Sequence, residues 1–206
     1  EIGVMEKEEI QNNIFSLLEH DMGNDIKVSM FEGKEDGIYE PGLSALEKRG
    51  ISNIVPSYDK EKCIMCNLCS FVCPHAVVRP YLLTKDEYEK APEEVKQDCK
   101  EAKIKDHDLM YTVGVSVYDC TGCFLCSNIC PTGAIRMDKI KEKEKVKFNY
   151  LETLEDKKVM DVNTVKGSQF IKPSFSFSGA CSGCGETPYL KLLSQLFKDN
   201  LMIANA

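Results

Sequence analysis

Cysteine is the residue type that could carry most of the chemistry of this 206-residue chain. It occurs eleven times, an odd number, mostly in groups. Two groups share the spacing C-x-x-C-x-x-C-x-x-x-C-P: Cys63, Cys66, Cys69 and Cys73 form the first, and Cys120, Cys123, Cys126 and Cys130 form the second. A secreted disulfide framework would usually bring a signal peptide and an even number of cysteines, and the first residues, EIGVMEKEEI, do not resemble a signal peptide. We therefore expect reduced, metal-binding thiolates in a cytoplasmic protein.

The spacing within each group is that of two-cluster bacterial ferredoxins. Three thiolates at successive three-residue steps reach three corners of one iron–sulfur cluster, and the fourth points toward the other cluster. This predicts that Cys63, Cys66, Cys69 and Cys130 hold one [4Fe–4S] cluster, and that Cys73, Cys120, Cys123 and Cys126 hold a second. Zinc is the alternative, but structural zinc sites use paired C-x-x-C knuckles on separate hairpins. Because no ligand is missing, neither cluster would have an open position for substrate, and the predicted role is electron transfer.

Three cysteines lie outside the two quartets. Cys99 lies in the polar segment QDCKEA, which is expected to be helical; it has no partner at useful spacing, and we expect a free structural thiol. Cys181 and Cys184 form a C-x-x-C pair in SGACSGCGETP, just before an expected helix. The pair could be half of a third cluster site or a redox pair of the thioredoxin kind, because helix N-termini lower thiol pKa values. A third cluster would need two more ligands, and the eight cysteines of the quartets are already assigned.

The composition excludes several other classes of protein. The formal net charge of −7 argues against nucleic acid as a partner, since phosphate contacts need clustered cations. No stretch approaches the unbroken apolar run that a membrane helix requires, so we expect no membrane span. With 43% hydrophobic and 29% charged residues, the chain is expected to fold as one large or two small domains.

The elements around the quartets can be predicted from periodicity and turn residues. Residues 6–20 read as an amphipathic helix, residues 26–31 as a short strand, and 33–42 as a loop. Residues 52–59 and 110–119 are expected to be extended, the first at a sheet edge because of Pro56. Between the quartets, a capping box at Thr84 and Glu87 predicts one or two surface helices over 84–103.

Two further segments follow the second quartet. In residues 138–147, lysines alternate with other residues. A basic binding stripe is possible, but a solvated strand or loop is the favoured interpretation. Thr187 and Pro188 suit the start of a helix with Leu190, Leu193 and Phe197 on one face, and LMIANA resembles the beginning of a strand.

These features predict an α+β fold built on a two-cluster, ferredoxin-like domain. The segments HAVVRP and TGAIRM, which follow the two quartets, echo one another, so we expect pseudo-twofold symmetry interrupted by the inserted helices. The expected divisions are a lead-in segment (1–42), the ferredoxin-like domain (43–158) and the start of a further domain (159–206).

Over roughly residues 30–206 the chain resembles pyruvate:ferredoxin (flavodoxin) oxidoreductase. The resemblance is carried by three runs: EKRGISNIVPSYDKEKCIMCNLCSFVCPHAVVRPYLL, VKGSQF and FSFSGACSGCGETPYLKLLSQLF. This family comprises large thiamine-diphosphate enzymes that act on 2-oxoacids. The resemblance implies that the quartets form its inserted ferredoxin domain and that residues 159–206 begin its thiamine-diphosphate domain. It also implies that Cys181 and Cys184 are two ligands of a third [4Fe–4S] cluster, and that Glu186 contacts thiamine diphosphate.

The family converts pyruvate and coenzyme A to acetyl-CoA and carbon dioxide, and it is oxygen-sensitive, homodimeric and dependent on thiamine diphosphate and Mg²⁺. By resemblance, this chain would relay electrons from the thiamine adduct to ferredoxin or flavodoxin, and none of its residues is expected to be catalytic. The other ligands of the third cluster and the substrate-binding domains would lie outside these 206 residues. The alternatives are a stand-alone ferredoxin-like carrier, an iron–sulfur subunit of another redox complex, or a zinc-bound interaction module. The sequence after residue 165 argues against a simple carrier.

Overall fold

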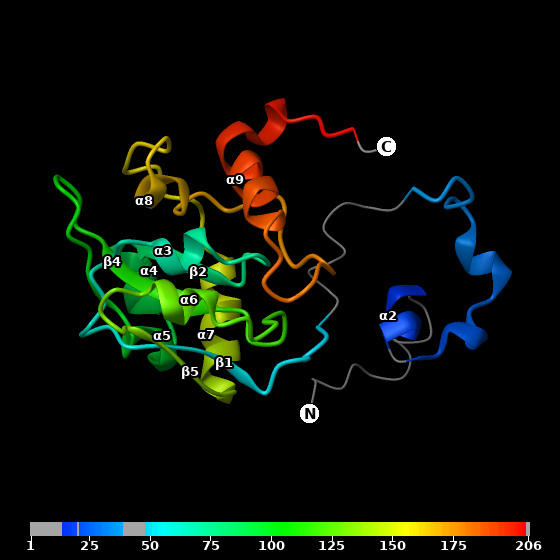
Figure 1. Ribbon diagram of the computed structural model, residues 1–206, viewed down its shortest axis with the longest axis horizontal. Coiled ribbons are helices and arrows are strands. Elements are labelled where there is room, and N and C mark those ends of the chain that lie inside the picture. The colour runs from blue at the N-terminus through cyan, green and yellow to red at the C-terminus, as the bar shows by residue number, and fades with distance from the viewer. Residues whose placement is uncertain (1–13, 20, 39–47, 205–206) are drawn as a thin grey trace. The chain divides into compact units, whose positions relative to one another are not determined.

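The computed structural model describes residues 14–19, 21–38 and 48–204, which fall into two compact units, Glu1–Glu47 and Lys48–Ala206 (Figure 1). In the first unit, helix α2 (Ile14–Glu19) is followed by two 3-10 turns, η1 (Gly23–Asp25) and η2 (Val28–Phe31). The helix agrees with the prediction for 6–20 where it can be compared; residues 6–13 and 20 lie outside the described residues.

The short strand predicted for residues 26–31 is wrong. The segment turns instead, and its backbone bonds are local: Met30 N–H donates to Lys27 O at 2.9 Å, and Ile26 N–H donates to Gly23 O at 3.3 Å. A strand needs a neighbour to satisfy its backbone groups. Among the described residues of this unit there is no strand to pair with, and the 3-10 turns supply partners within the segment.

The second unit is an α+β fold with two small antiparallel sheets. Its strands are β1 (Ile54–Tyr58), β2 (Val78–Leu83), β3 (Lys100–Glu101), β4 (Met110–Val115) and β5 (Ile135–Lys139). Strand β1 pairs with β5, and the other sheet has the order β2-β4-β3. The strand before each cysteine quartet therefore pairs with the strand after the other quartet, so the two cysteine loops are held together. Pro56 lies on an edge strand, as predicted.

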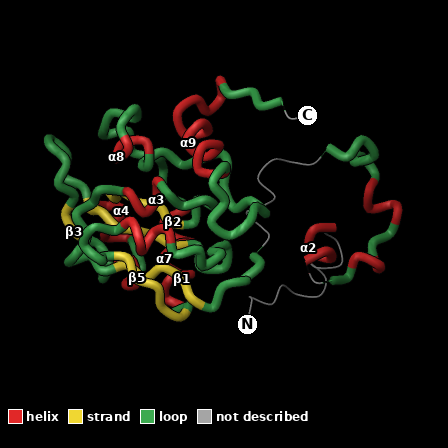
Figure 2. The backbone as a smooth tube through the Cα atoms, viewed as in Figure 1, coloured by secondary structure: helices red, strands yellow, loops and turns green. Residues whose placement is uncertain are grey.

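Short helices complete each quartet, and longer ones cover the sheets. The helices of this unit are α3 (Leu68–Phe71), α4 (Lys85–Lys90), α5 (Glu93–Lys96), α6 (Leu125–Ile129), α7 (Glu142–Glu152), α8 (Val165–Ser168), α9 (Thr187–Phe197) and the 3-10 turn η4 (Lys198–Asn200). Helices α4 and α5 are the predicted surface helices between the quartets, but the helical prediction is wrong for residues 97–103, where Lys100 and Glu101 form β3 and pair with β4. The capping box of α4 is present: Glu87 N–H donates to Thr84 Oγ1 at 3.3 Å, and Thr84 N–H donates to Glu87 Oε2 at 2.7 Å. The stretches that carry the cysteines are largely loop (Figure 2).

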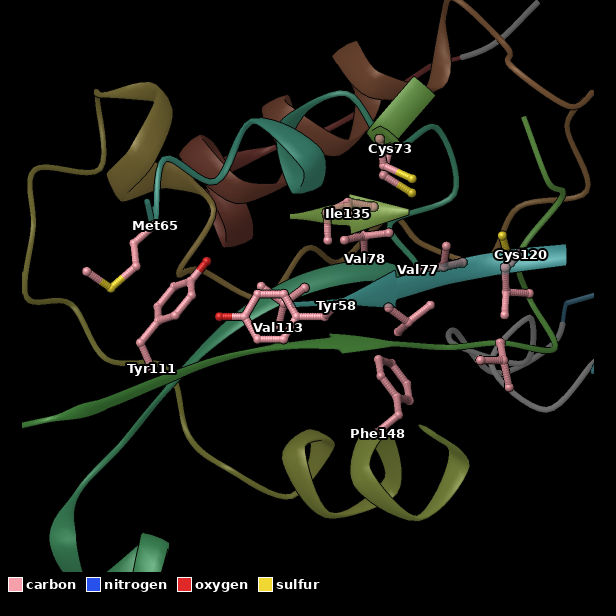
Figure 3. Close-up of a cluster of buried hydrophobic side chains, with 14 of the residues drawn as sticks. Tyr58, Met65, Cys73, Val77, Val78, Tyr111, Val113, Cys120, Ile135 and Phe148 are labelled. Atoms are coloured by element: carbon pink, nitrogen blue, oxygen red, sulfur yellow. The ribbon is translucent and has the colours of Figure 1, made fainter. Parts of the chain in front are cut away.

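Helix α7 corrects part of the expectation of a strand or loop over residues 138–147: residues 138–141 are strand and loop, but the chain is helical from Glu142 onward. The helix buries Glu144, Lys147, Phe148 and Leu151, a helical spacing that the alternating lysines conceal. Phe148 points from α7 toward the core (Figure 3). Gly114 of β4 allows this approach, since a Cβ atom there would lie 2.9 Å from Leu151 Cδ1. Packing therefore outweighs the local pattern.

Helix α9 begins and ends close to its predicted bounds, but its exposed face differs from that of an ordinary amphipathic helix. Leu193 and Phe197 are 38% and 51% exposed, whereas Lys191, Ser194 and Gln195 are buried. The side chain of Gln195 accepts from Gln169 and donates to Ile171 O, so the polar face packs against the rest of this unit. Residues 201–204 are not a strand; the last two residues of LMIANA lie outside the described residues.

Candidate metal centres

Two cavities lie at the cysteine quartets. One is lined by Cys63, Cys66, Cys69 and Cys130; the other is lined by Cys73, Cys120, Cys123 and Cys126. We call them cavity one and cavity two. Each takes three thiols from one quartet and one from the other, the same grouping as in the two predicted ligand sets. In the described residues, no three His, Cys, Asp or Glu side chains come close enough to bind a single metal ion, so each set of thiols surrounds a space.

The two cysteine loops have the same backbone conformation. Met65 and Asn67 are left-handed, with φ of 57° and 61°, and Gly122 and Phe124 occupy the equivalent positions with φ of 64° and 65°. A third matched pair, Ala76 and Gly133, has φ of 54° and 64°. A left-handed conformation costs a non-glycine residue about 1 to 2 kcal/mol. Its recurrence at equivalent positions shows that the two quartets form matching loops.

These tight loops direct backbone N–H groups at sulfur atoms. Met65 N–H donates to Cys63 Sγ at 3.3 Å, and Gly122 N–H donates to Cys120 Sγ at 3.4 Å. Ala134 N–H donates to Cys130 Sγ at 3.2 Å. Hydrogen bonds of this kind favour the thiolate over the thiol, which is the form that binds metal.

Burial opposes the charged form of several of these cysteines. It raises the pKa of Cys69 to about 12, with neighbouring thiolates at Cys63 and Cys66 adding to the rise. Burial also raises the pKa of Cys120 to about 12. Burial also acts to raise the pKa of Cys130, but hydrogen bonds from backbone N–H groups bring that pKa below the ordinary value. Four thiolates in one apolar cavity are therefore stable only with a cationic group among them, and an iron–sulfur core satisfies that need.

Three side chains support the cavities and could not be found from the cysteine pattern. Lys100 of β3 donates to the carbonyls of Lys60, at 2.7 Å, and Cys63, and so ties the inserted segment to cavity one. His75 lines cavity two and is 2% exposed. Its Nδ1 lies 3.1 Å from Ser178 O, and its Nε2 has no partner among the described residues. The third side chain, Lys191, reaches the segment between Cys69 and Cys73.

The pair Cys181 and Cys184 lies against the loop of the second quartet. Ser182 Oγ donates to Thr121 O at 3.1 Å, and a Cβ atom on Gly183 would lie 3.7 Å from Cys123 Cβ. The N–H groups of Thr187 and Glu186, at the start of α9, lower the pKa of the Cys184 thiol. Cys181 and Glu186 are exposed at the same end of the helix. A group held by this pair would therefore be a direct neighbour of cavity two.

Cys99 is separate from both cavities. It follows α5 in a turn rather than in a helix, is 4% exposed, and belongs to a small second core with Val95 and Leu151. Burial raises its pKa to about 11. Such an inert thiol is typical of a structural cysteine.

The fold and the two thiol-lined cavities define the class of the protein. Residues 59–134 match the family of 4Fe–4S dicluster domains, so the chain carries a ferredoxin-like dicluster domain that binds [4Fe–4S] clusters. None of the helices in the described segments is long and apolar enough to cross a bilayer.

Comparison with curated proteins defines the family more narrowly. The chain is 44% identical to a pyruvate:ferredoxin oxidoreductase of Moorella thermoacetica and 44% identical to a pyruvate-flavodoxin oxidoreductase of Enterobacter agglomerans, each match covering 89% of this chain and 16% of the relative. It is 45% identical to a pyruvate dehydrogenase [NADP(+)] of Cryptosporidium parvum, over 89% of this chain and 10% of the relative. The chain is thus homologous to one segment of the pyruvate:ferredoxin and pyruvate-flavodoxin oxidoreductases, which confirms the resemblance, and it spans 10% to 16% of the length of these relatives.

Proposed function

We propose that this chain is the electron-relay segment of a pyruvate:ferredoxin (flavodoxin) oxidoreductase. The observation that carries the proposal is the exchange of cysteines between two otherwise separate loops: each cavity has three thiols from one quartet and the fourth from the other. Two closed, all-thiolate sites next to one another are suited to passing electrons and leave no position for substrate.

The proposed ligands of cluster one are Cys63, Cys66, Cys69 and Cys130, and those of cluster two are Cys73, Cys120, Cys123 and Cys126. A bound [4Fe–4S] cluster supplies one-electron redox chemistry. The chain supplies the thiolates, the N–H donors to sulfur and an apolar wall that excludes water, which together set the potential. The matched loop conformations and crossed strand pairs support a pseudo-twofold relation between the halves.

The contacts of Cys181 and Cys184 support an order for the relay. Their loop packs on that of Cys123, a proposed ligand of cluster two. Helix α3 and its last turn join Cys69 to Cys73, and so join cluster one to cluster two. Electrons would then enter near Cys181 and Cys184, pass to cluster two, and leave from cluster one.

The remaining assignments follow from homology. Cys181 and Cys184 would be half of the third [4Fe–4S] cluster, and Glu186, exposed beside them, would contact thiamine diphosphate with its Mg²⁺. On this proposal residues 43–158 form the ferredoxin-like domain and 159–206 begin the thiamine domain. Pyruvate and coenzyme A would be substrates of a cytoplasmic homodimer. Two of these relatives are named for ferredoxin or flavodoxin, and on this proposal one of these carriers is the final acceptor.

Anaerobic metal analysis tests the proposal directly. We expect about eight irons and about eight acid-labile sulfides per chain, four of each per cluster, and two interacting [4Fe–4S]⁺ signals by EPR after dithionite reduction. Stoichiometric zinc without sulfide would overturn it. A third cluster in the same 206-residue chain would overturn the assignment of Cys181 and Cys184 as an incomplete site.

A further inference from the structure

Lys191 is a buried cation without a carboxylate partner. Its side chain is 1% exposed, in the middle of α9. Its ammonium donates to three backbone carbonyls, those of Ser70, Phe71 at 2.9 Å and Cys73 at 3.3 Å. None of the ion pairs between described residues includes it. By contrast Lys147, equally buried, lies 2.8 Å from Asp98 and 4.0 Å from Glu144.

The three carbonyls explain the hydrogen bonds of Lys191 but not its charge. Ser70 and Phe71 lie in the last turn of α3 and Cys73 lies two residues beyond it, and Ser70 O also accepts from Cys73 N–H at 3.1 Å. A neutral donor would satisfy them, and α3 has only four residues, so its dipole contributes little. Burying an ammonium costs several kcal/mol unless a negative charge offsets it. The anionic group that Lys191 complements must therefore be found elsewhere.

The structure places Lys191 beside cysteines of both proposed ligand sets, since its ammonium bonds to Cys73 O at 3.3 Å and to the carbonyl of Ser70, the residue after Cys69. Burial lowers the pKa of Lys191 to about 8, while the thiolates of Cys73 and then Cys69 act to raise it, and Arg79 acts to lower it. Cys73 is a proposed ligand of cluster two, and Cys69 of cluster one. Since the bonded carbonyls lie in and between these two cysteines, the ammonium is placed beside both ligand sets.

We propose that Lys191 is a positioning residue of the electron relay, whose ammonium stabilises the reduced form of both clusters, and of cluster two most. The inference rests on the proposed ligand sets. Reduction adds one negative charge to a cluster, and a fixed cation in a low-dielectric surrounding favours that state. The effect is larger for cluster two because Lys191 bonds directly to the carbonyl of its ligand Cys73.

The charge is supplied from outside the dicluster domain. Lys191 lies 118 residues beyond Cys73 in sequence, on the helix that begins just after Cys184. The potentials of the two clusters would therefore depend on the docking of α9, so that the segment carrying the third-cluster cysteines also adjusts the clusters to which it delivers electrons.

EPR-monitored redox titration of the chain, purified anaerobically, tests this inference. At the wild-type midpoint potential, Lys191→Met should lower the ratio of reduced to oxidised cluster two roughly tenfold, which is about 59 mV for one electron. Cluster one should shift in the same direction by less. Lys191→Arg retains the charge and should keep the wild-type potentials.

Lys198→Met is the matched control, because Lys198 lies just after α9 and pairs at the surface with Asp156 at 2.9 Å. It should leave both potentials unchanged. If Lys191→Met does not retain its clusters, Lys191→Gln, which still donates to the carbonyls, takes its place. Wild-type potentials in the neutral variant, or an equal shift in Lys191→Arg, would overturn the inference. Absence of two cluster signals in the wild-type chain would instead overturn the proposed function.

Discussion

Replacing Cys130 with alanine should damage cluster one, although Cys130 belongs to the second quartet. The Cys130 thiol lines cavity one with Cys63, Cys66 and Cys69. In the reverse sense, Cys73→Ala should damage cluster two while leaving the other three cysteines of its own quartet in place. The pair of variants separates an exchange of ligands from two independent four-cysteine loops.

The expected magnitude follows from the ligand count. Each substitution removes one of four thiols from one cavity and none from the other. A cube that loses one thiolate either loses the iron at that corner or dissociates. Total iron should therefore fall from about eight to about seven or about four per chain, while the other cluster keeps its four irons.

The assay is a comparison of EPR spectra between single-cysteine variants, with iron and sulfide analysis of each. The spectrum of Cys130→Ala should match that of Cys63→Ala, and that of Cys73→Ala should match that of Cys123→Ala. In all four variants the interaction between the two reduced clusters should disappear. If Cys130→Ala instead matched Cys123→Ala, each quartet would hold its own cluster, and our interpretation of the two cavities would be wrong.

Two further predictions concern the surroundings of the clusters. Arg79→Met should lower the free energy of unfolding by about 1.5 to 3 kcal/mol in urea titrations, because it removes the Arg79 donor 2.8 Å from Glu152 and leaves Lys172, at 3.0 Å, and Tyr81 as the partners of Glu152. Burial acts to raise the pKa of Glu152, but Arg79, Tyr81 and Lys172 together hold it below its ordinary value of 4.5, so the stabilisation from these partners is present above pH 4.5 and is lost in acid. If the difference in the free energy of unfolding between variant and wild type stayed the same in acid, the assignment of a stabilising Arg79–Glu152 ion pair would be wrong. In iodoacetamide labelling of the chain with its two clusters, Cys184 should react with a midpoint below pH 9.0, the ordinary thiol pKa, because Thr187 and Glu186 N–H groups stabilise its thiolate. Cys99, with a pKa of about 11, should stay unlabelled until the chain unfolds, and equal labelling of the two would refute this account.

The parts of the site that could be predicted from the sequence are those encoded by local spacing. The repeat places equivalent positions 57 residues apart, from Cys63 to Cys120 and from Val78, at the start of β2, to Ile135, at the start of β5. The cysteine loops, and the helices and strands that follow them, therefore recur at the same spacing. Helices α4 and α5 were also predictable within 84–103, because capping is a contact between neighbours in sequence, whereas strand β3 at Lys100–Glu101 was not.

The parts that were missed depend on distant contacts. Helix α7 was not predicted, because the lysines of residues 139–147 alternate with other residues. Its buried face is identified only by its packing against Gly114 and the sheet. His75 bonds to Ser178, 103 residues away, and Lys191 to Cys73, 118 residues away. No periodicity within either segment specifies such a partner. The strand predictions for residues 26–31 and 201–204 were wrong for a related reason: a strand-like sequence forms no strand without a neighbouring strand to pair with.

Helix α9 yields a prediction opposite to that of its hydrophobic pattern. By the pattern alone, Leu193 and Phe197 should be buried and substitution by glutamine should be costly. In the structure 38% of Leu193 and 51% of Phe197 stay exposed, so Leu193→Gln and Phe197→Gln should each lower the free energy of unfolding of this chain by no more than about 1 kcal/mol.

The costly substitution should be on the polar face. Gln195→Leu, which makes that face more apolar, should cost about 1 to 3 kcal/mol in urea titrations. It leaves Ile171 O and Gln169 Nε2 without the partners that Gln195 provides at 2.8 and 3.1 Å. Should Leu193→Gln prove more destabilising than Gln195→Leu, α9 would pack with its apolar face inward. Lys191 could not then reach the carbonyl of Cys73, and the proposed electrostatic link between this helix and the clusters would fail with it.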